Sequence, residues 1–268
     1  MKFALVALAF IGAALAAPNV RIPRPSLKIV GGKDASKGEF PYQISYQYGL
    51  LGTWSHICGG SILNENWIIT AGHCVSEAPA FGDYRIVAGI LDLDEESDLK
   101  QEILVSQKIV HPGFDGGVGP NDIALLKLAS PLVLNEVIQP VSLPSSDLVA
   151  SGDVVLSGWG SMGGVIIPIM PNRLQKAELP IIPNDECNNA LNAISAEDNP
   201  FDDASNICTG PLTGGYSACS GDSGGPLAVD GVLVGVVSWG FVPCGSAGAP
   251  SVYTKVANFV DWINENAK

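Results

Sequence analysis

Basic residues are scarce in this sequence. It has 14 Lys and Arg against 27 Asp and Glu, a formal net charge of −13 over 268 residues. Lys2, Arg21, Arg24 and Lys28 are the only charged residues among the first 28, so the rest of the chain carries −17, with ten basic residues against 27 acidic ones. Because a polyanion needs a basic surface, we expect no nucleic-acid partner.

Long apolar runs are absent after the N-terminus. A membrane-spanning helix needs about 20 apolar residues, and no segment after residue 17 supplies them. Residues 1–17 combine Lys2, an apolar run and a small-residue exit, which is the layout of a secretory signal peptide. The sequence therefore predicts a signal peptide over 1–17 and a secreted protein with no membrane partner.

Metal-binding patterns are also missing. The six cysteines include no CxxC pair and no Cys/His cluster at zinc spacing. The acidic run at 92–98 lacks the glycine of an EF-hand loop, and its twelfth position is Ile103 in place of glutamate. We expect a solvated acidic loop there, no metal and no cofactor. In a secreted chain the six cysteines predict three disulfides, although composition leaves their pairing open.

Short strand-like runs fill the chain after residue 29, which favours an all-β fold. They cover residues 42–47, 57–63, 67–71, 84–90, 102–110, 122–128, 153–159, 226–229, 232–239 and 251–256. Asp230-Gly231 predicts a type I′ hairpin turn between the runs that flank it. Only residues 256–268 show apolar side chains at helical spacing, and the stretch 131–144 is a candidate linker between two β domains.

Residues 18–28, PNVRIPRPSLK, are basic and hold three prolines, a composition typical of an extended, exposed segment. The segment ends at Lys28-Ile29, a bond that a Lys- or Arg-specific protease could cut. The bond after Arg24 is protected from such a protease by the following Pro25. The bond after Arg21 is a competing site, but a cut there would start the chain at IPRP instead of IVGG.

Asp222, in the stretch SACSGDSGGP, has no Lys, Arg or His within ten positions on either side. If this stretch is buried, the carboxylate needs a distant partner, because an unpaired buried charge costs about 3–5 kcal/mol. The next residue, Ser223, lies among glycines that allow close approach by another molecule.

Two further residues complete a candidate catalytic set: His73 in TAGHC and Asp122 at the start of DIALLKL. Each alone is an ordinary structural residue, but together with Ser223 they supply a nucleophile, a base and an orienting carboxylate. Gly221 to Gly225 also fits the G-x-S-x-G elbow of α/β hydrolases, whose histidine follows the serine. No histidine follows Ser223, so that fold is excluded.

The motifs IVGG, TAGHC, DIALL, GDSGGP and SWG, in this order, resemble those of the chymotrypsin-like, trypsin-fold serine proteases. The resemblance covers residues 29–268, and within the family the sequence most resembles the precursors of arthropod digestive chymotrypsins. It implies two six-stranded antiparallel β-barrels, at 29–135 with His73 and Asp122 and at 136–268 with Ser223, and a C-terminal α-helix. It also implies the disulfide pairs Cys58–Cys74, Cys187–Cys208 and Cys219–Cys244.

The same resemblance assigns roles to other residues. The N–H groups of Gly221 and Ser223 would form the oxyanion hole, and Ser238 would hydrogen-bond Asp122. Cleavage after Lys28 by a trypsin-like activating protease would free the amino group of Ile29 to pair with Asp222. The uncut precursor would hold Asp222 through His56 and Ser45.

The specificity pocket would be built on three small residues, Ser217, Gly240 and Ser251. Trypsin-like enzymes need an aspartate at the position of Ser217, so the resemblance implies a chymotrypsin-like preference for large apolar or aromatic residues. An elastase-like or mixed specificity and a catalytically inactive binding homologue are the alternatives. We expect a monomeric digestive enzyme, secreted into an extracellular space such as the gut lumen, with protein or peptide substrates and protein inhibitors as partners.

Overall fold

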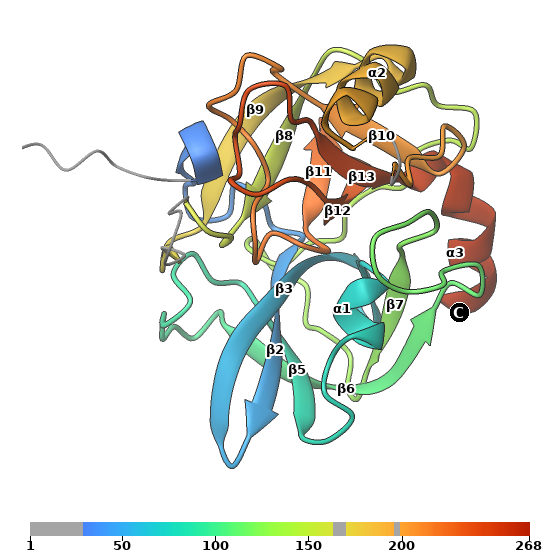
Figure 1. Ribbon diagram of the computed structural model, residues 1–268. Coiled ribbons are helices and arrows are strands. Elements are labelled where there is room, and N and C mark those ends of the chain that lie inside the picture. The colour runs from blue at the N-terminus through green and yellow to red at the C-terminus, as the bar shows by residue number, and fades with distance from the viewer. Residues whose placement is uncertain (1–28, 163–169, 196–198) are drawn as a thin grey trace, which may run out of the picture.

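The computed structural model describes residues 29–162, 170–195 and 199–268 (Figure 1). The predicted signal peptide, 1–17, and activation segment, 18–28, lie outside these ranges. Within them, every helix is too short or too polar to cross a bilayer.

The first barrel closes six antiparallel strands in the order β2-β3-β4-β7-β6-β5. Its strands are β2 (Gln43–Leu50), β3 (Thr53–Asn64), β4 (Trp67–Thr70), β5 (Asp83–Ala88), β6 (Gln101–Val110) and β7 (Ala124–Leu128). All four residues of β4 are buried, as are four of the five in β7. These two strands therefore read as nearly continuous apolar runs and form the centre of the barrel core.

The second barrel runs β8-β9-β10-β13-β12-β11 and closes because β8 also pairs with β9. Its strands are β8 (Asp153–Gly158), β9 (Gln175–Ile182), β10 (Asn206–Thr209), β11 (Pro226–Val229), β12 (Val232–Trp239) and β13 (Ser251–Lys255). Asp230 and Gly231 join β11 to β12 with φ angles of 49° and 76°, the two positive values that a type I′ turn requires. The expected all-β architecture of two six-stranded barrels is thus confirmed, as is the hairpin.

The two ends of the described chain cross between the barrels. The short strand β1 (Lys33–Asp34) precedes the first barrel but pairs with β9 of the second. The C-terminal helix α3 (Val260–Asn266) follows the second barrel, yet its buried Ile263 belongs to the apolar cluster that holds most of the first barrel's core, together with a few residues of β11 and β12. Trp67 of β4 donates its indole N–H to the carbonyl of Lys268 at 3.2 Å. The division of the chain at 135/136 stays a prediction.

Several elements escaped the sequence analysis. The turn η2 (Val256–Phe259) and α3 lie where a helix was expected, but α1 (His73–Ser76) and α2 (Asn184–Ser195) were not. Strand β9 contains Pro180, which argues against a strand because proline has no N–H for the ladder. Its carbonyl still accepts a hydrogen bond from Gly210, so the strand survives the missing donor.

The crossing of α3 onto the first barrel should contribute measurably to stability. We expect Ile263→Ala, which empties a fully buried site, to lower the free energy of unfolding by about 2–5 kcal/mol. The neighbouring exposed Asn264 provides the matched control, since Asn264→Ala should change it by less than about 0.5 kcal/mol. Chemical denaturation of the two variants measures this, and equal effects would show that α3 does not anchor the barrel.

Candidate active site

Ser223 lies in a tight loop just before β11, where the loop touches the first barrel. The Ser223 carbonyl accepts a hydrogen bond of 2.8 Å from the N–H of Gly59 on β3. Gly224 has a φ of +75°, and a Cβ atom there would lie 2.1 Å from the hydroxyl oxygen of Thr70 at the end of β4. Only glycine fits this position, so the glycines after Ser223 allow the loop to reach the other barrel.

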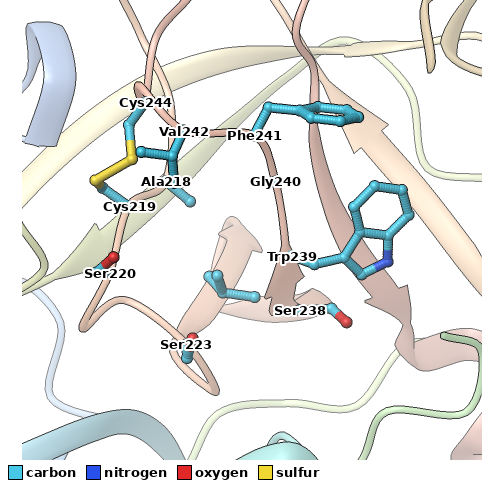
Figure 2. Close-up of a pocket in the computed structure, with 11 residues that line it drawn as sticks. Ala218, Cys219, Ser220, Ser223, Ser238, Trp239, Gly240, Phe241, Val242 and Cys244 are labelled. Atoms are coloured by element: carbon cyan, nitrogen blue, oxygen red, sulfur yellow. A yellow bond between two sulfur atoms is a disulfide. The ribbon is translucent and has the colours of Figure 1, made fainter. Parts of the chain in front are cut away.

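Beside Ser223 is a cavity of about 160 Å³, shown in Figure 2. Its walls are Ala218, Cys219, Ser220, Ser223, Val237, Ser238, Trp239, Gly240, Phe241, Val242 and Cys244. None of these side chains is charged. Of the three predicted pocket residues, Gly240 lines the cavity directly. A Cβ atom on it would meet nothing closer than 3.9 Å, so the glycine leaves this wall open.

The other two predicted pocket residues lie behind the wall. Ser217 and Ser251 are 5% and 4% exposed and are not among the residues that line the cavity. The Ser251 hydroxyl accepts the N–H of Ala218, a wall residue, at 3.1 Å. The Ser217 hydroxyl is buried and has no hydrogen-bond partner among the described residues. An unsatisfied buried hydroxyl costs about 1–3 kcal/mol, so Ser217 is a strained point beside the cavity wall.

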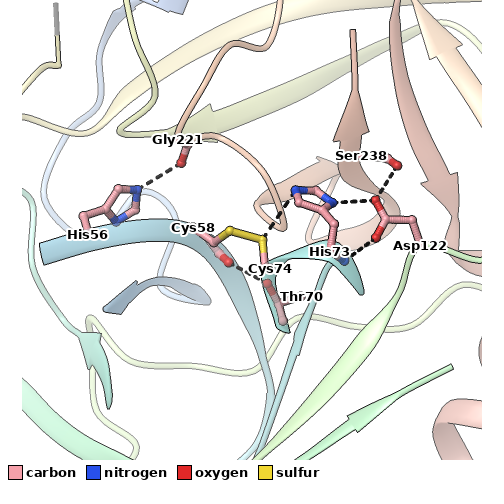
Figure 3. Close-up of a disulfide and its surroundings, with 9 residues drawn as sticks. His56, Cys58, Thr70, His73, Cys74, Asp122, Gly221 and Ser238 are labelled. Atoms are coloured by element: carbon pink, nitrogen blue, oxygen red, sulfur yellow. Dashed lines mark hydrogen bonds and ion pairs between the residues drawn. A yellow bond between two sulfur atoms is a disulfide. The ribbon is translucent and has the colours of Figure 1, made fainter. Parts of the chain in front are cut away.

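Asp122 is the best-satisfied carboxylate of the site (Figure 3). One oxygen accepts the backbone N–H of His73 at 2.8 Å, and the other accepts His73 Nδ1–H at 2.7 Å and the Ser238 hydroxyl at 2.6 Å. Asp122 is 1% exposed. Because a carboxylate only accepts hydrogen bonds, the His73 proton is fixed on Nδ1 and Nε2 keeps its lone pair as a base.

The environment of His73 also sets its basicity. Burial acts to lower the pKa of His73, but the hydrogen bond and the charge of Asp122 outweigh burial and raise the pKa above 6.5. His73 Nε2 lies 3.7 Å from Cys74 Sγ, and no hydrogen bond joins it to Ser223 within the described residues. Ser238 connects His73 and Ser223 indirectly. It lines the cavity together with Ser223, and its hydroxyl donates a hydrogen bond to Asp122, the partner of His73.

The backbone around Gly221 is arranged as an anion site. The Ser220 carbonyl accepts the N–H of Ser161 at 2.7 Å. In a trans peptide this directs the N–H of Gly221 to the opposite side. Neither this N–H nor that of Ser223 donates a hydrogen bond to any described residue. Two free N–H groups flanking a nucleophile are what an oxyanion hole needs.

Asp222 is fully buried and contrasts with Asp122. Its carboxylate accepts the N–H groups of Gly160 at 2.8 Å and Cys219 at 2.9 Å. A Cβ atom on Gly160 would lie 2.3 Å from this carboxylate, so the glycine makes its space. Burial raises the pKa of Asp222 to about 7, although both hydrogen bonds oppose the rise. Ile29, fully buried in the core of the second barrel, is still an amide in the uncut chain and offers no cation.

His56 and Ser45 form a chain that ends on the loop but does not reach Asp222. His56 Nε2 lies 2.9 Å from the Gly221 carbonyl, and its Nδ1 lies 2.8 Å from the Ser45 hydroxyl. Burial lowers the pKa of His56 despite the bond to Gly221, so the ring is neutral and its Nε2–H donates. The expected contact of His56 with Asp222 is not made here, and its role in a precursor stays a prediction.

Three disulfides brace the site. They join Cys58 to Cys74, Cys187 to Cys208 and Cys219 to Cys244, the pairs that the resemblance implied. The first fixes α1, which begins with His73, onto β3. Cys58, His73 and Cys74 also come close enough to hold a metal ion. Because both sulfurs are in a disulfide, neither is the thiolate that a metal would require.

Some residues of the site were missed by the sequence analysis. Thr254 of β13 donates its hydroxyl to the Asp122 carbonyl at 2.6 Å. Phe241 and Val242 extend the cavity wall beyond Gly240. The SWGFV stretch that contains them was visible in the sequence, but only the pairing of β12 with β13 shows where it lies.

Two β-barrels that meet at a buried Asp–His pair, a loop serine and two free N–H groups define the class of two-barrel serine proteases. A family model described as Trypsin matches residues 29–263. "Trypsin-1" of Astacus astacus is 45% identical over 252 residues, 89% of this chain and 100% of that protein. "Trypsin II-P29" of Gallus gallus is 39% identical, covering 99% and 98%. The chain belongs to the trypsin family of serine endopeptidases, whose substrates are proteins, so the family expected from the motifs is confirmed.

The Asp122–His73 pair predicts a specific pH profile. The base works only when neutral, so kcat/KM should rise with pH through a pKa above 6.5. Asp122→Asn should lower kcat/KM by about 10⁴-fold, as is typical of this change in related triads, and move the remaining limb to lower pH. Steady-state kinetics between pH 5 and 9 test this, with the exposed Asp261→Asn as control. An unchanged limb in Asp122→Asn would mean that another group titrates.

Asp222 predicts how the stability of the uncut chain depends on pH. Its folded-state pKa, about 7, exceeds its ordinary 3.8. The folded chain therefore holds a proton that the unfolded chain releases, and this contribution to stability falls from about pH 4 to about pH 7. Thermal unfolding of the precursor and of Asp222→Asn across this range measures it. The variant should lose the downward trend, whereas parallel curves would show that Asp222 is already paired.

Proposed function

We propose that this protein is a secreted precursor, activated by cleavage after Lys28, that hydrolyses peptide bonds after large apolar or aromatic residues. The uncharged cavity beside Ser223 supports this substrate class most directly. Its open wall at Gly240 admits a bulky side chain, and the free hydroxyl of Ser217 lies behind it. A lysine or arginine side chain would find no carboxylate on this wall, and burying an unpaired cation is costly.

In the proposed reaction the substrate's side chain fills the cavity and places its carbonyl carbon beside Ser223. Ser223 Oγ attacks that carbon while His73 Nε2 takes the hydroxyl proton, and Asp122 stabilises the resulting imidazolium. The N–H groups of Gly221 and Ser223 hold the oxyanion. His73 then protonates the leaving amine, and water releases the acyl group from Ser223 by the same steps. For this, His73 Nε2 must exchange its contact with Cys74 Sγ for one with Ser223, a tightening common on substrate binding.

Activation is proposed to act through Asp222. The cut after Lys28 converts the Ile29 amide into an ammonium group, the cation that the buried carboxylate lacks. An opposite charge in that pocket would lower the pKa of Asp222 and keep it ionised. A trypsin-like protease is the expected activator, because an enzyme selective for apolar residues would not cut after Lys28.

Two other specificities remain to be distinguished. The relatives named trypsin would suggest cleavage after Lys or Arg, whereas this cavity is uncharged. An elastase-like preference would follow if the segment from Cys244 to Pro250 narrows the cavity. An inactive homologue is the third alternative, and labelling of Ser223 by a sulfonyl fluoride would exclude it.

The test is a comparison of matched peptides. The precursor is activated with immobilised trypsin, the trypsin is removed, and kcat/KM is measured for peptides with Phe, Leu, Ala or Arg before the scissile bond. We expect Phe or Leu to be preferred, and Gly240→Val, which fills the open wall, to shift preference towards Ala. A Ser223→Ala precursor treated identically reports any residual trypsin. Preference for Arg above that background would overturn the proposed specificity in favour of a trypsin-like one.

A further inference from the structure

A second hollow, of about 300 Å³, lies where the two barrels meet and shares no residue with the cavity at Ser223. Phe40 and Tyr42, from the segment that enters β2, form one wall, and Pro140 forms another. The β11–β12 turn with Asp230 and the side chain of Glu39 complete the rim. We call this site the junction groove.

The charge of the junction groove is one-sided. Its lining contains two carboxylates, Glu39 and Asp230, and no Lys, Arg or His. Glu39 forms an ion pair with Lys176, which lies outside the lining. Asp230 is exposed and pairs with no cation among the described residues. Carboxylates above aromatic and proline walls are suited to an extended, proline-containing peptide with basic side chains.

The chain itself contains such a peptide. Residues 18–28 include three prolines, three basic residues and no acidic one, whereas the rest of the protein after them is strongly acidic. Prolines favour the extended polyproline conformation, which aromatic grooves bind at low entropic cost. The segment has no cysteine, so after a cut at Lys28 only non-covalent contacts could retain it.

The start of the described chain lies close to the groove. A Cβ atom on Gly32 would lie 2.8 Å from the carbonyl oxygen of Lys176, the residue whose ammonium group pairs with Glu39. Lys33 is directly paired with Lys176 in the sheet. An extended chain advances about 3.3–3.6 Å per residue, so Arg24, five residues before Ile29, can reach roughly 17 Å back from it. The segment therefore starts beside Lys176, which pairs with Glu39 on the rim of the groove, and has roughly 17 Å of chain up to Arg24 with which to extend along it.

We propose that residues 18–28 dock in the junction groove, with their arginines facing Asp230 and Glu39 and their prolines on the half-buried Phe40 and the exposed Pro140. This inference rests on the proposed activation segment. In the precursor the docked segment holds Lys28 in a defined position next to Ile29, which is buried in the core of the second barrel. After cleavage it remains bound by charge and by apolar contact and leaves as ionic strength rises.

The first test uses the uncut precursor and needs neither cleavage nor activity. Amide hydrogen exchange is compared between wild type and Arg21→Ser/Arg24→Ser. Loss of docking should speed exchange in the β11–β12 turn at residues 230–232 and leave the distant tip of the β2–β3 hairpin at 51–53 unchanged. Equal exchange at the turn would overturn the proposal, whether or not Lys28 is the activation site.

The second test follows the segment after the cut. The precursor is cleaved with immobilised trypsin, cleavage after Lys28 is verified by intact mass, and the protein is gel-filtered at low salt and at about 1 M salt, where charge attraction is screened within about 3 Å. The released peptide, residues 18–28 or, where trypsin also cuts after Arg21, residues 22–28, should co-elute only at low salt. Asp230→Asn, which keeps a side chain tolerated at positive φ, should weaken its binding roughly fivefold, and the exposed Asp83→Asn should not. Free peptide at low salt, or equal retention in both variants, would refute docking. A precursor not cut after Lys28 would instead refute the proposed activation.

Discussion

The hydrogen-bonded carboxylate of Asp122 is the interaction on which the site depends. It lies in the first barrel but accepts bonds from both, since His73 belongs to the first and Ser238 to the second. Thr254, also of the second barrel, binds the backbone carbonyl of the same residue. Any change in how the barrels are packed would therefore alter the donors to Asp122, and with them the tautomer and the basicity of His73.

The two buried aspartates show how a single residue type serves two purposes. Asp122 accepts three hydrogen bonds, one of them from the ring that takes up the proton during the reaction. Among the residues that the structure describes, Asp222 accepts two amide N–H groups and faces no cation, and burial raises its pKa to about 7. Asp122 thus receives a histidine and a hydroxyl as partners, whereas the described donors to Asp222 are backbone amides alone.

The sequence predicted the fold and the chemical groups better than it predicted their surroundings. The motifs around His73, Asp122 and Ser223 are local and carried the family resemblance that implied the two barrels, while the short strand-like runs alone favoured only an all-β fold. The orientation of the Gly221 peptide depends on Ser161, sixty residues away, and no local pattern encodes it. The role of Ser217 and Ser251 in the pocket stays a prediction: both are buried next to the lining residue Ala218, Ser217 in sequence and Ser251 through a hydrogen bond. Helix α2 was missed because its sequence is polar, and its burial comes from contacts of Cys187 and Leu191 with residues distant in sequence.

The exchange of terminal segments between the barrels has a mechanical consequence. Strand β1 precedes the first barrel but pairs with the second, and α3 follows the second barrel but packs against the first. Each barrel is therefore in contact with a terminal segment that adjoins the other barrel in the sequence. The connection at residues 131–144 is therefore not the only link between them. A chain cut within that connection would therefore keep its two barrels associated through these segments, and with them the hydrogen bonds from Ser238 and Thr254 to Asp122.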